Sequence, residues 1–139
     1  MTSVALSIII VNWNSKDYVR NCIASIRAHT SSIEYEIIVV DSGSFDGCGR
    51  MLQSIYPEVH FVQSNLNVGF ARANNLGAES ARGRVLLFLN PDTEVMNGAI
   101  ERLYRNVSSL PDTGVLGCRL LKVRELDALL SLRTRLRRV

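Results

Sequence analysis

The sequence begins with a nearly continuous apolar run at residues 4–11 that is rich in β-branched side chains. A run of this kind is typical of a strand covered on both faces, as strands are in parallel sheets. Parallel neighbours cannot be joined by a tight turn and need a crossover, usually a helix. The first run therefore favours an α/β fold in which helical segments must follow.

Helical segments and further apolar runs do alternate along the chain. Further strands are predicted at residues 36–41, 59–62, 84–89 and 115–121. Amphipathic spacing predicts helices at residues 15–29 with Ser15 as the N-cap, around 51–55, at 70–81 and from 99 to near Pro111. The order βαβαβαβαβ predicts a doubly wound, mostly parallel, Rossmann-like sheet within residues 1–121, followed by a tail at residues 122–139.

Composition excludes several classes of protein. Hydrophobic residues make up 47% and charged residues 21% of the 139 residues, the balance of a globular domain. No apolar run approaches the ~18 residues of a membrane span and no signal peptide is evident, so we expect a cytoplasmic protein. Three cysteines without a CxxC pair predict buried free thiols rather than a disulfide framework or a zinc site.

The net charge of +3 comes from the tail. Residues 1–118 carry 9 basic and 11 acidic side chains, whereas residues 119–139 carry 7 basic and 2 acidic ones. A basic face for nucleic acid across the domain is therefore not expected. In the tail, leucines alternate with arginines. The tail can be a basic amphipathic helix that contacts the inner face of an anionic membrane, or it can be the end of a truncated or frame-shifted gene. We favour the second interpretation.

Polar side chains follow the apolar runs at the point where each strand should end. They are Asn12, Trp13 and Asn14 after the first run, Asp41 and Ser42 after the second, Asn65 to Gly69 before the third helix, and the segment Asn90, Pro91 and Asp92 after the fourth run. In an open α/β sheet, ligands bind outside the carboxyl ends of the strands. These residues are therefore predicted to line one crevice.

Four segments, taken in order, resemble glycosyltransferase family 2. They read SIIIVNWNS, EIIVVDSGSFDG, NLNVGFARANNLG and RVLLFLNPDTEV, and the likeness covers about residues 4–120. The family consists of inverting nucleotide-sugar transferases with the GT-A fold, and the likeness is strongest to its rhamnosyltransferase-type members. It implies a UDP-, dTDP- or GDP-sugar donor and a glycan or lipid-linked acceptor in cell-wall or polysaccharide biosynthesis.

The resemblance also implies roles for the ends of the first two strands. The segment from Val11 to Asn14 would pack on the base and ribose, and Asp41 would accept a hydrogen bond from the imide N–H of the base. A fixed carboxylate selects uracil or thymine over cytosine, whose ring N3 is an acceptor. Ser42 stands where asparagine is common in the family. Taken without the other motifs, Asp41 is more typical of a turn.

Asn67 and Gly69 resemble the family's Asn-x-Gly turn into a helix whose N-terminus faces the sugar nucleotide. Free N–H groups and the helix dipole favour an anion at such a place. Gly69 would give the backbone access to the ligand, and Arg72 would pair with the diphosphate. Asn74 or Asn75 would hold hydroxyls of the ribose or sugar. From the residues alone, a simple turn glycine and a solvated surface arginine are the alternatives.

Asn90, Pro91 and Asp92 occupy the place of the family's DxD motif, with asparagine in place of the first acid. Pro91 favours extended backbone at Asn90, which would carry the strand to its end and present Asp92 at the crevice. The resemblance implies that Asp92 holds Mg²⁺ or Mn²⁺ against the diphosphate, with water completing an octahedral shell. Without the motif, Asp92 is equally typical of an N-cap.

An inverting transfer needs a general base for the acceptor hydroxyl, and the family places that acid in a C-terminal half beyond the metal motif. This sequence continues for only 47 residues after Asp92, and we identify no counterpart. Two hypotheses follow. The chain is a glycosyltransferase, or it is a truncated, non-catalytic nucleotide-sugar-binding module that lacks the acceptor half and depends on a partner chain or on self-association.

Overall fold

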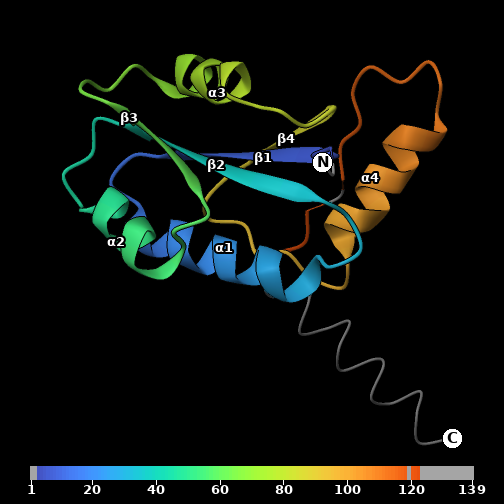
Figure 1. Cartoon of the computed structure of the whole chain (residues 1–139), viewed down its shortest axis with the longest axis horizontal. Coiled ribbons are helices and arrows are strands. Elements are labelled where there is room, and N and C mark those ends of the chain that lie inside the picture. The colour runs from blue at the N-terminus through green and yellow to red at the C-terminus, as the bar shows by residue number, and fades with distance from the viewer. Residues whose placement is uncertain (1–2, 119, 123–139) are drawn as a thin grey trace, which may run out of the picture.

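Four strands and four helices alternate along the chain (Figure 1). The computed structural model describes residues 3–118 and 120–122. The strands are β1 (Leu6–Asn12), β2 (Tyr35–Ser42), β3 (His60–Ser64) and β4 (Val85–Leu89). The helices are α1 (Lys16–His29), α2 (Cys48–Ile55), α3 (Phe70–Glu79) and α4 (Ala99–Ser109). The alternation predicted up to the fourth helix is confirmed, with boundaries shifted by a few residues.

The strands form one parallel sheet in the order β3-β2-β1-β4. β1 lies inside the sheet, and its Ile9 is in register with Ile38 of β2 and Phe88 of β4. Every residue of β1 is buried, as expected of a strand with neighbours on both sides and helices on both faces. The predicted α/β class with a parallel sheet is therefore confirmed.

Side chains of β1 alternate between two hydrophobic clusters, one on each face of the sheet. Ile9 and Val11 pack with Ala73 beneath α3, whereas Ile8 and Ile10 belong to the cluster on the face of α1, α2 and α4 (Figure 1). Each fully buried isoleucine contributes about 2 kcal/mol through the hydrophobic effect. The first apolar run thus supplies core side chains to both faces of the sheet.

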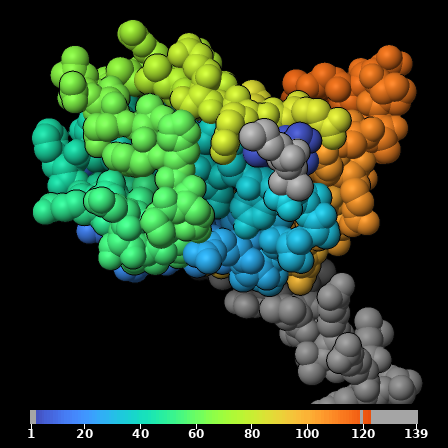
Figure 2. All heavy atoms as spheres, viewed as in Figure 1, coloured from blue at the N-terminus to red at the C-terminus, as the bar shows by residue number. Residues whose placement is uncertain are grey.

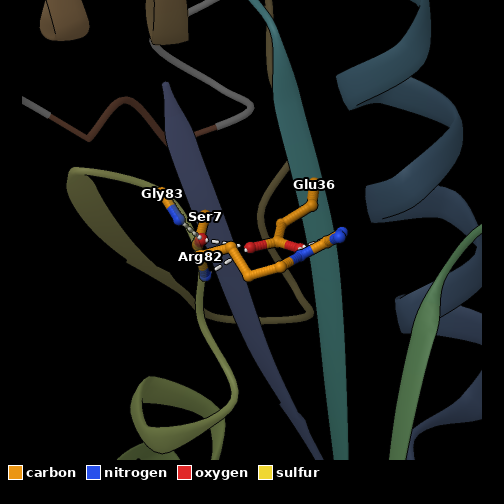
Figure 3. Close-up of polar contacts among 4 residues, drawn as sticks. All are labelled: Ser7, Glu36, Arg82 and Gly83. Carbon is orange, nitrogen blue, oxygen red and sulfur yellow. Dashed lines mark hydrogen bonds and ion pairs between the residues drawn. The ribbon is translucent and has the colours of Figure 1, made fainter. Parts of the chain in front are cut away.

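Four residues fasten the end of the sheet that is remote from the carboxyl ends of the strands (Figure 3). The Glu36 carboxylate accepts hydrogen bonds from the Ser7 hydroxyl at 2.6 Å and from the Arg82 backbone N–H at 2.7 Å. The Arg82 guanidinium forms an ion pair with the same carboxylate, at 2.7 Å. The Gly83 N–H donates to the Ser7 hydroxyl at 2.8 Å. The turn between α3 and β4 is therefore held against β1 and β2.

Two predictions about the end of the chain are wrong. The described part of residues 115–121 forms no strand, because a strand needs a hydrogen-bonding neighbour and this segment does not pair with the outer edge of β4. Cys118 in this segment is exposed, since no layer covers it, whereas Cys22 and Cys48 are buried free thiols as predicted.

The predicted amphipathic tail lies outside the described residues, except for Lys122. Among the helices of the described part, none is both long enough and apolar enough to cross a membrane.

Candidate functional site

The carboxyl ends of β1 and β2 meet at a buried polar pair, Asn12 and Asp41. The Asn12 amide donates to Asp41 Oδ2 at 2.7 Å. Asp41 is only 2% exposed, and its Oδ1 accepts from the Ser44 N–H at 2.8 Å and from Gln63 Nε2 at 3.0 Å. A carboxylate offers about four lone-pair positions, and these three bonds leave one on Oδ2. Asp41 thus ties β1, β3 and the loop after β2 together below the crevice.

Asp46 is a central residue of this region that the sequence analysis missed. Its Oδ2 accepts from the Lys16 N–H at 2.8 Å and its Oδ1 from the Cys48 N–H at 3.0 Å, so one carboxylate caps both α1 and α2. Ser15 does occupy the N-cap position of α1, but its hydroxyl donates to Asn12 Oδ1 instead of capping the helix. An acid before a helix is a capping signal, but the sequence predicted this helix only around residues 51–55, whereas α2 begins at Cys48, two residues after Asp46.

Asn14 joins the loop after β1 to the loop after β2. It adopts a left-handed conformation with φ of 50°. Its backbone N–H donates to the Ser44 hydroxyl and its side-chain oxygen accepts from the Phe45 N–H, both at 3.0 Å. In the described structure, the Asn14 side chain therefore holds the two loops in place.

Ser42 fastens the loop that precedes α3. Its buried hydroxyl accepts from the Val68 N–H at 3.0 Å and donates to Asn67 Oδ1 at 3.2 Å. Next to it, Gly43 has φ of +72°, and a Cβ there would lie 2.6 Å from the carbonyl carbon of Leu66. The two loops therefore touch through their backbones, and a glycine is required at this approach.

A hollow of about 350 Å³ opens at the carboxyl end of the sheet. Its walls are Val11, Trp13, Ser15, Ser42, Asn67, Gly69, Phe70 and Pro91. Five of these are predicted site residues from three separate segments, so the fold brings them together. Pro91 belongs to the fourth segment predicted for the crevice, whereas the sequence analysis did not predict Ser15 or Phe70 as wall residues. The rings of Trp13 and Phe70 are exposed and available for stacking against a flat ligand.

The N-terminus of α3 forms one wall of the hollow. Gly69, at its N-cap, has φ of 80° and ψ of 164°, a conformation that is essentially restricted to glycine. No side chain caps the helix. Within the described residues, the backbone N–H groups of Phe70, Ala71 and Arg72 have no hydrogen-bond acceptor, since the first bond of the helix runs from the Ala73 N–H to Gly69 O. This arrangement favours an anion.

Three further residues of α3 that were predicted for the site do not line the hollow. Asn74 is buried and donates its side-chain N–H to Phe70 O at 3.0 Å, so its amide turns back onto its own helix. Arg72 and Asn75 are exposed. Periodicity places all three residues on one helix but does not show which of them face a ligand.

Burial, and to a lesser degree the negative charge of Asp92, raise the pKa of the Cys22 thiol to about 12, so this thiol is neutral.

Asn90 and Asp92 follow β4 and are both exposed, while Pro91 between them lines the hollow. The described part of the chain contains no group of three or more His, Cys, Asp or Glu side chains that could hold a metal. One exposed carboxylate suits Mg²⁺ binding of the kind in which phosphates and water supply the other oxygens.

Comparisons with known proteins decide the family. The sequence profile described as Glycosyl transferase family 2 matches residues 7–130. The chain belongs to glycosyl transferase family 2. Glycosyltransferase AglE of Haloferax volcanii is 30% identical over 114 residues, which cover 79% of this chain and 36% of AglE. The uncharacterized glycosyltransferase YfnE of Bacillus subtilis is 34% identical over 88 residues, which cover 62% of this chain and 22% of YfnE.

A solved structure shares the fold. S. aureus TarS 1-349 in complex with UDP matches with a TM-score of 0.67 and 19% identity, over 82% of this chain and 38% of that one. This likeness confirms the predicted GT-A type of arrangement. The family 2 chain described here spans 22–38% of the length of these three relatives, so it corresponds to a part of each of them.

Proposed function

We propose that this chain is the donor-binding part of a glycosyltransferase and holds a nucleoside-diphosphate sugar for inverting transfer to a glycan or lipid-linked acceptor. The observation that carries the proposal is the hollow at the carboxyl end of β1 and β2, where the exposed ring of Trp13 lies on the same walls as the uncapped N-terminus of α3. A ring surface suits a base, and free backbone N–H groups suit a diphosphate.

The residues around the hollow divide between the parts of such a donor. Val11 and Trp13 provide apolar surface for the base and ribose. Gly69 and the first turn of α3 provide N–H donors for the diphosphate, and the exposed guanidinium of Arg72 is available to pair with it. The side-chain oxygen of Asn67 accepts hydrogen bonds from the Ser42 hydroxyl and the Gly69 N–H. Its side-chain N–H₂ has no partner within the described residues. It is free to donate to a hydroxyl or phosphate oxygen.

Asp92, with Asn90 beside it, would hold Mg²⁺ or Mn²⁺ in this proposal. When bound, the cation supplies charge that neutralises the departing nucleoside diphosphate. A single carboxylate is sufficient where the donor's own phosphate oxygens complete the shell. We assign no general base for the acceptor hydroxyl among the described residues, so the proposal for this chain covers donor binding and not the proton transfer.

Asp92→Ala is the first test of this proposal. We expect calorimetric titration of the wild-type chain with UDP or dTDP to show binding that Mn²⁺ strengthens, and the variant to lose at least about tenfold in affinity when Mn²⁺ is present. Asp17→Ala removes an exposed acid of α1 that lies outside the hollow and should leave the affinity unchanged. Absence of binding by the wild-type chain to either nucleotide, with and without Mn²⁺, would refute the donor site.

The solvent-exposed face of β4 favours a second candidate function, that of a non-catalytic module completed by another polypeptide. Leu86 and Phe88 share a face of the sheet with Ile9, but α3 covers β1 and β2 and leaves these two side chains 40% and 51% exposed. The segment after α4 stands apart from α3, with a notch between them (Figure 2). A groove of about 550 Å³ lies between β4, α4 and residues 113–116. Neighbouring exposed apolar side chains beside a groove are a feature of interaction sites.

This second candidate predicts that the purified chain self-associates through the β4 surface. We expect the sedimentation coefficient to rise with protein concentration, and the double variant Leu86→Lys, Phe88→Lys to stay monomeric because its charges cannot be buried in the contact. Phe45→Lys alters an equally apolar but isolated and fully exposed ring, and it should self-associate like the wild type. A strictly monomeric wild-type chain with robust transferase activity would rule this candidate out.

A further inference from the structure

The segment that joins β4 to α4 carries Asp92 but has little regular structure of its own. A turn is closed by a hydrogen bond from the Thr93 N–H to Asn90 O at 3.1 Å, with Pro91 and Asp92 at its two central positions. The segment ends in two left-handed residues, Asn97 with φ of 53° and Gly98 with φ of 65°. One turn does not determine where the Asp92 carboxylate lies relative to the sheet. That placement depends on what the segment is attached to.

The segment is attached to α1 on both sides of Asp92. Before Asp92, the Cys22 thiol lies 3.9 Å from Asn90 O. After Asp92, the Val95 N–H donates to the Ser25 hydroxyl at 2.9 Å, and Val95 itself is buried in the core. The Ser25 hydroxyl in turn donates to Cys22 O at 2.7 Å. The proton of the Ser25 hydroxyl is therefore donated within the helix, and its oxygen accepts the bond from the Val95 N–H.

The Ser25 contact is the stronger of the two attachments, because a thiol is a weak hydrogen-bond donor and an amide N–H is a good one. Serine inside a helix is neutral or unfavourable for helix stability, so the stability of α1 does not explain this residue. Ser25 does not line the hollow, and among the described residues its hydroxyl forms hydrogen bonds with Cys22 and Val95 alone. Its bond to Val95 is the one that links it to the segment that carries Asp92.

We propose that Ser25 is a positioning residue that holds the Asp92 carboxylate at the mouth of the hollow. The inference rests on the proposed function, in which Asp92 binds the cation that contacts the diphosphate. It assigns to α1 a role beyond packing: the helix sets the distance between the cation site after β4 and the nucleotide site after β1. Loss of the Ser25 hydroxyl would leave Asp92 present but displaced.

The test compares UDP binding with and without Mn²⁺. Trp13 is the only tryptophan of the chain and lines the hollow, so its fluorescence reports UDP binding directly. For Ser25→Ala we expect the gain in UDP affinity that Mn²⁺ provides to fall by about fivefold, the usual effect of one hydrogen bond, with the metal-free affinity unchanged. Ser25→Thr keeps the hydroxyl and should restore the gain.

A matched control is Ser80→Ala. The hydroxyl of Ser80, the C-cap of α3, also donates to a helix carbonyl, Leu76 O at 3.1 Å, but within the described part of the chain it accepts no bond from another segment. This variant should leave both affinities unchanged. Amide hydrogen exchange at Val95 supplies an independent readout, because its N–H should exchange faster in Ser25→Ala than in the wild type.

Two results with Ser25→Ala would overturn the inference alone. One is an unchanged Mn²⁺ gain despite faster exchange at Val95, which would mean that the attachment does not position Asp92. The other is an equal loss of affinity with and without Mn²⁺, which is the mark of a general structural effect. A wild-type chain whose UDP binding gains nothing from Mn²⁺ would overturn the inference together with the proposed cation site. The wild-type titration alone identifies that case.

Discussion

Replacing Asp41 by alanine is expected to lower the free energy of unfolding by about 2–3 kcal/mol. The carboxylate is 2% exposed and is the nearest acceptor of the buried Asn12 amide. Its loss also leaves Gln63 Nε2 and the Ser44 N–H without this acceptor. A buried donor that loses its acceptor costs about 1–3 kcal/mol, and Asp41 also links β1, β3 and the loop after β2.

Urea unfolding followed by circular dichroism measures this change. Asp17→Ala is the control, because the Asp17 side chain is exposed and its pairing with Arg20 is a surface contact on one helix. We expect less than about 0.5 kcal/mol for that variant. If the two variants lost equally little stability, Asp41 would be an ordinary turn aspartate, and the hydrogen bonds around it would not contribute to the free energy of unfolding.

Asp41→Asn separates the structural role from the proposed recognition of the base. The amide keeps one acceptor oxygen and adds a donor. If Asp41 accepts the imide proton of uracil, the variant should bind UDP more weakly and lose preference for UDP over CDP, because an amide N–H can donate to the ring N3 of cytosine. A purely structural effect would lower both affinities in proportion, so the ratio of the two dissociation constants is the quantity to measure.

The second large effect is expected at Glu36, where Glu36→Ala should cost about 2 kcal/mol of stability. The Glu36 side chain is 8% exposed, whereas its ion-pair partner Arg82 is 72% exposed. The ion pair itself therefore contributes less than about 1 kcal/mol. Most of the effect comes from the bonds that Glu36 Oε1 accepts from the Ser7 hydroxyl and the Arg82 backbone N–H, both of which alanine removes. Arg82→Ala keeps that backbone N–H and should cost clearly less than Glu36→Ala.

The same carboxylate predicts a dependence of stability on pH. Burial acts to raise the pKa of Glu36, but hydrogen bonds from Ser7 and Arg82 and the charge of Arg82 outweigh it and hold the pKa below its ordinary value. A depressed folded-state pKa contributes stability that is complete above the unfolded value of about 4.3 and is lost as the pH falls through the folded value. The stability difference between wild type and Glu36→Ala should therefore be constant near neutral pH and shrink below about pH 4.3. Parallel stability curves over this range would contradict the assignment.

Local patterns in the sequence were sufficient for the elements up to α4. The apolar run that became β1 predicted a strand buried on both faces. The three-and-four spacing of Tyr18, Val19, Cys22, Ile23 and Ile26 predicted the apolar face of α1, and all of these except the exposed Tyr18 are buried. These predictions held because burial on both faces leaves few alternatives to a parallel sheet with crossover helices. The polar residues after the strands were predicted to converge, and Val11, Trp13, Ser42, Asn67 and Gly69 do line one hollow.

Other features of the fold depend on contacts between residues that are distant in sequence, and only the tertiary structure shows them. The fifth strand does not form, because apolar residues at 115–118 cannot supply the missing neighbour at the edge of β4. Asp46 caps α1 from 30 residues away, and Ser25 holds Val95 from 70 residues away. The pattern around each of these residues shows no partner, since a hydrogen bond is determined by where the fold brings its donor and acceptor. The sequence by itself determined the class of fold and the family, and the packing of the loops on α1 and β2 decided which side chains can face a ligand.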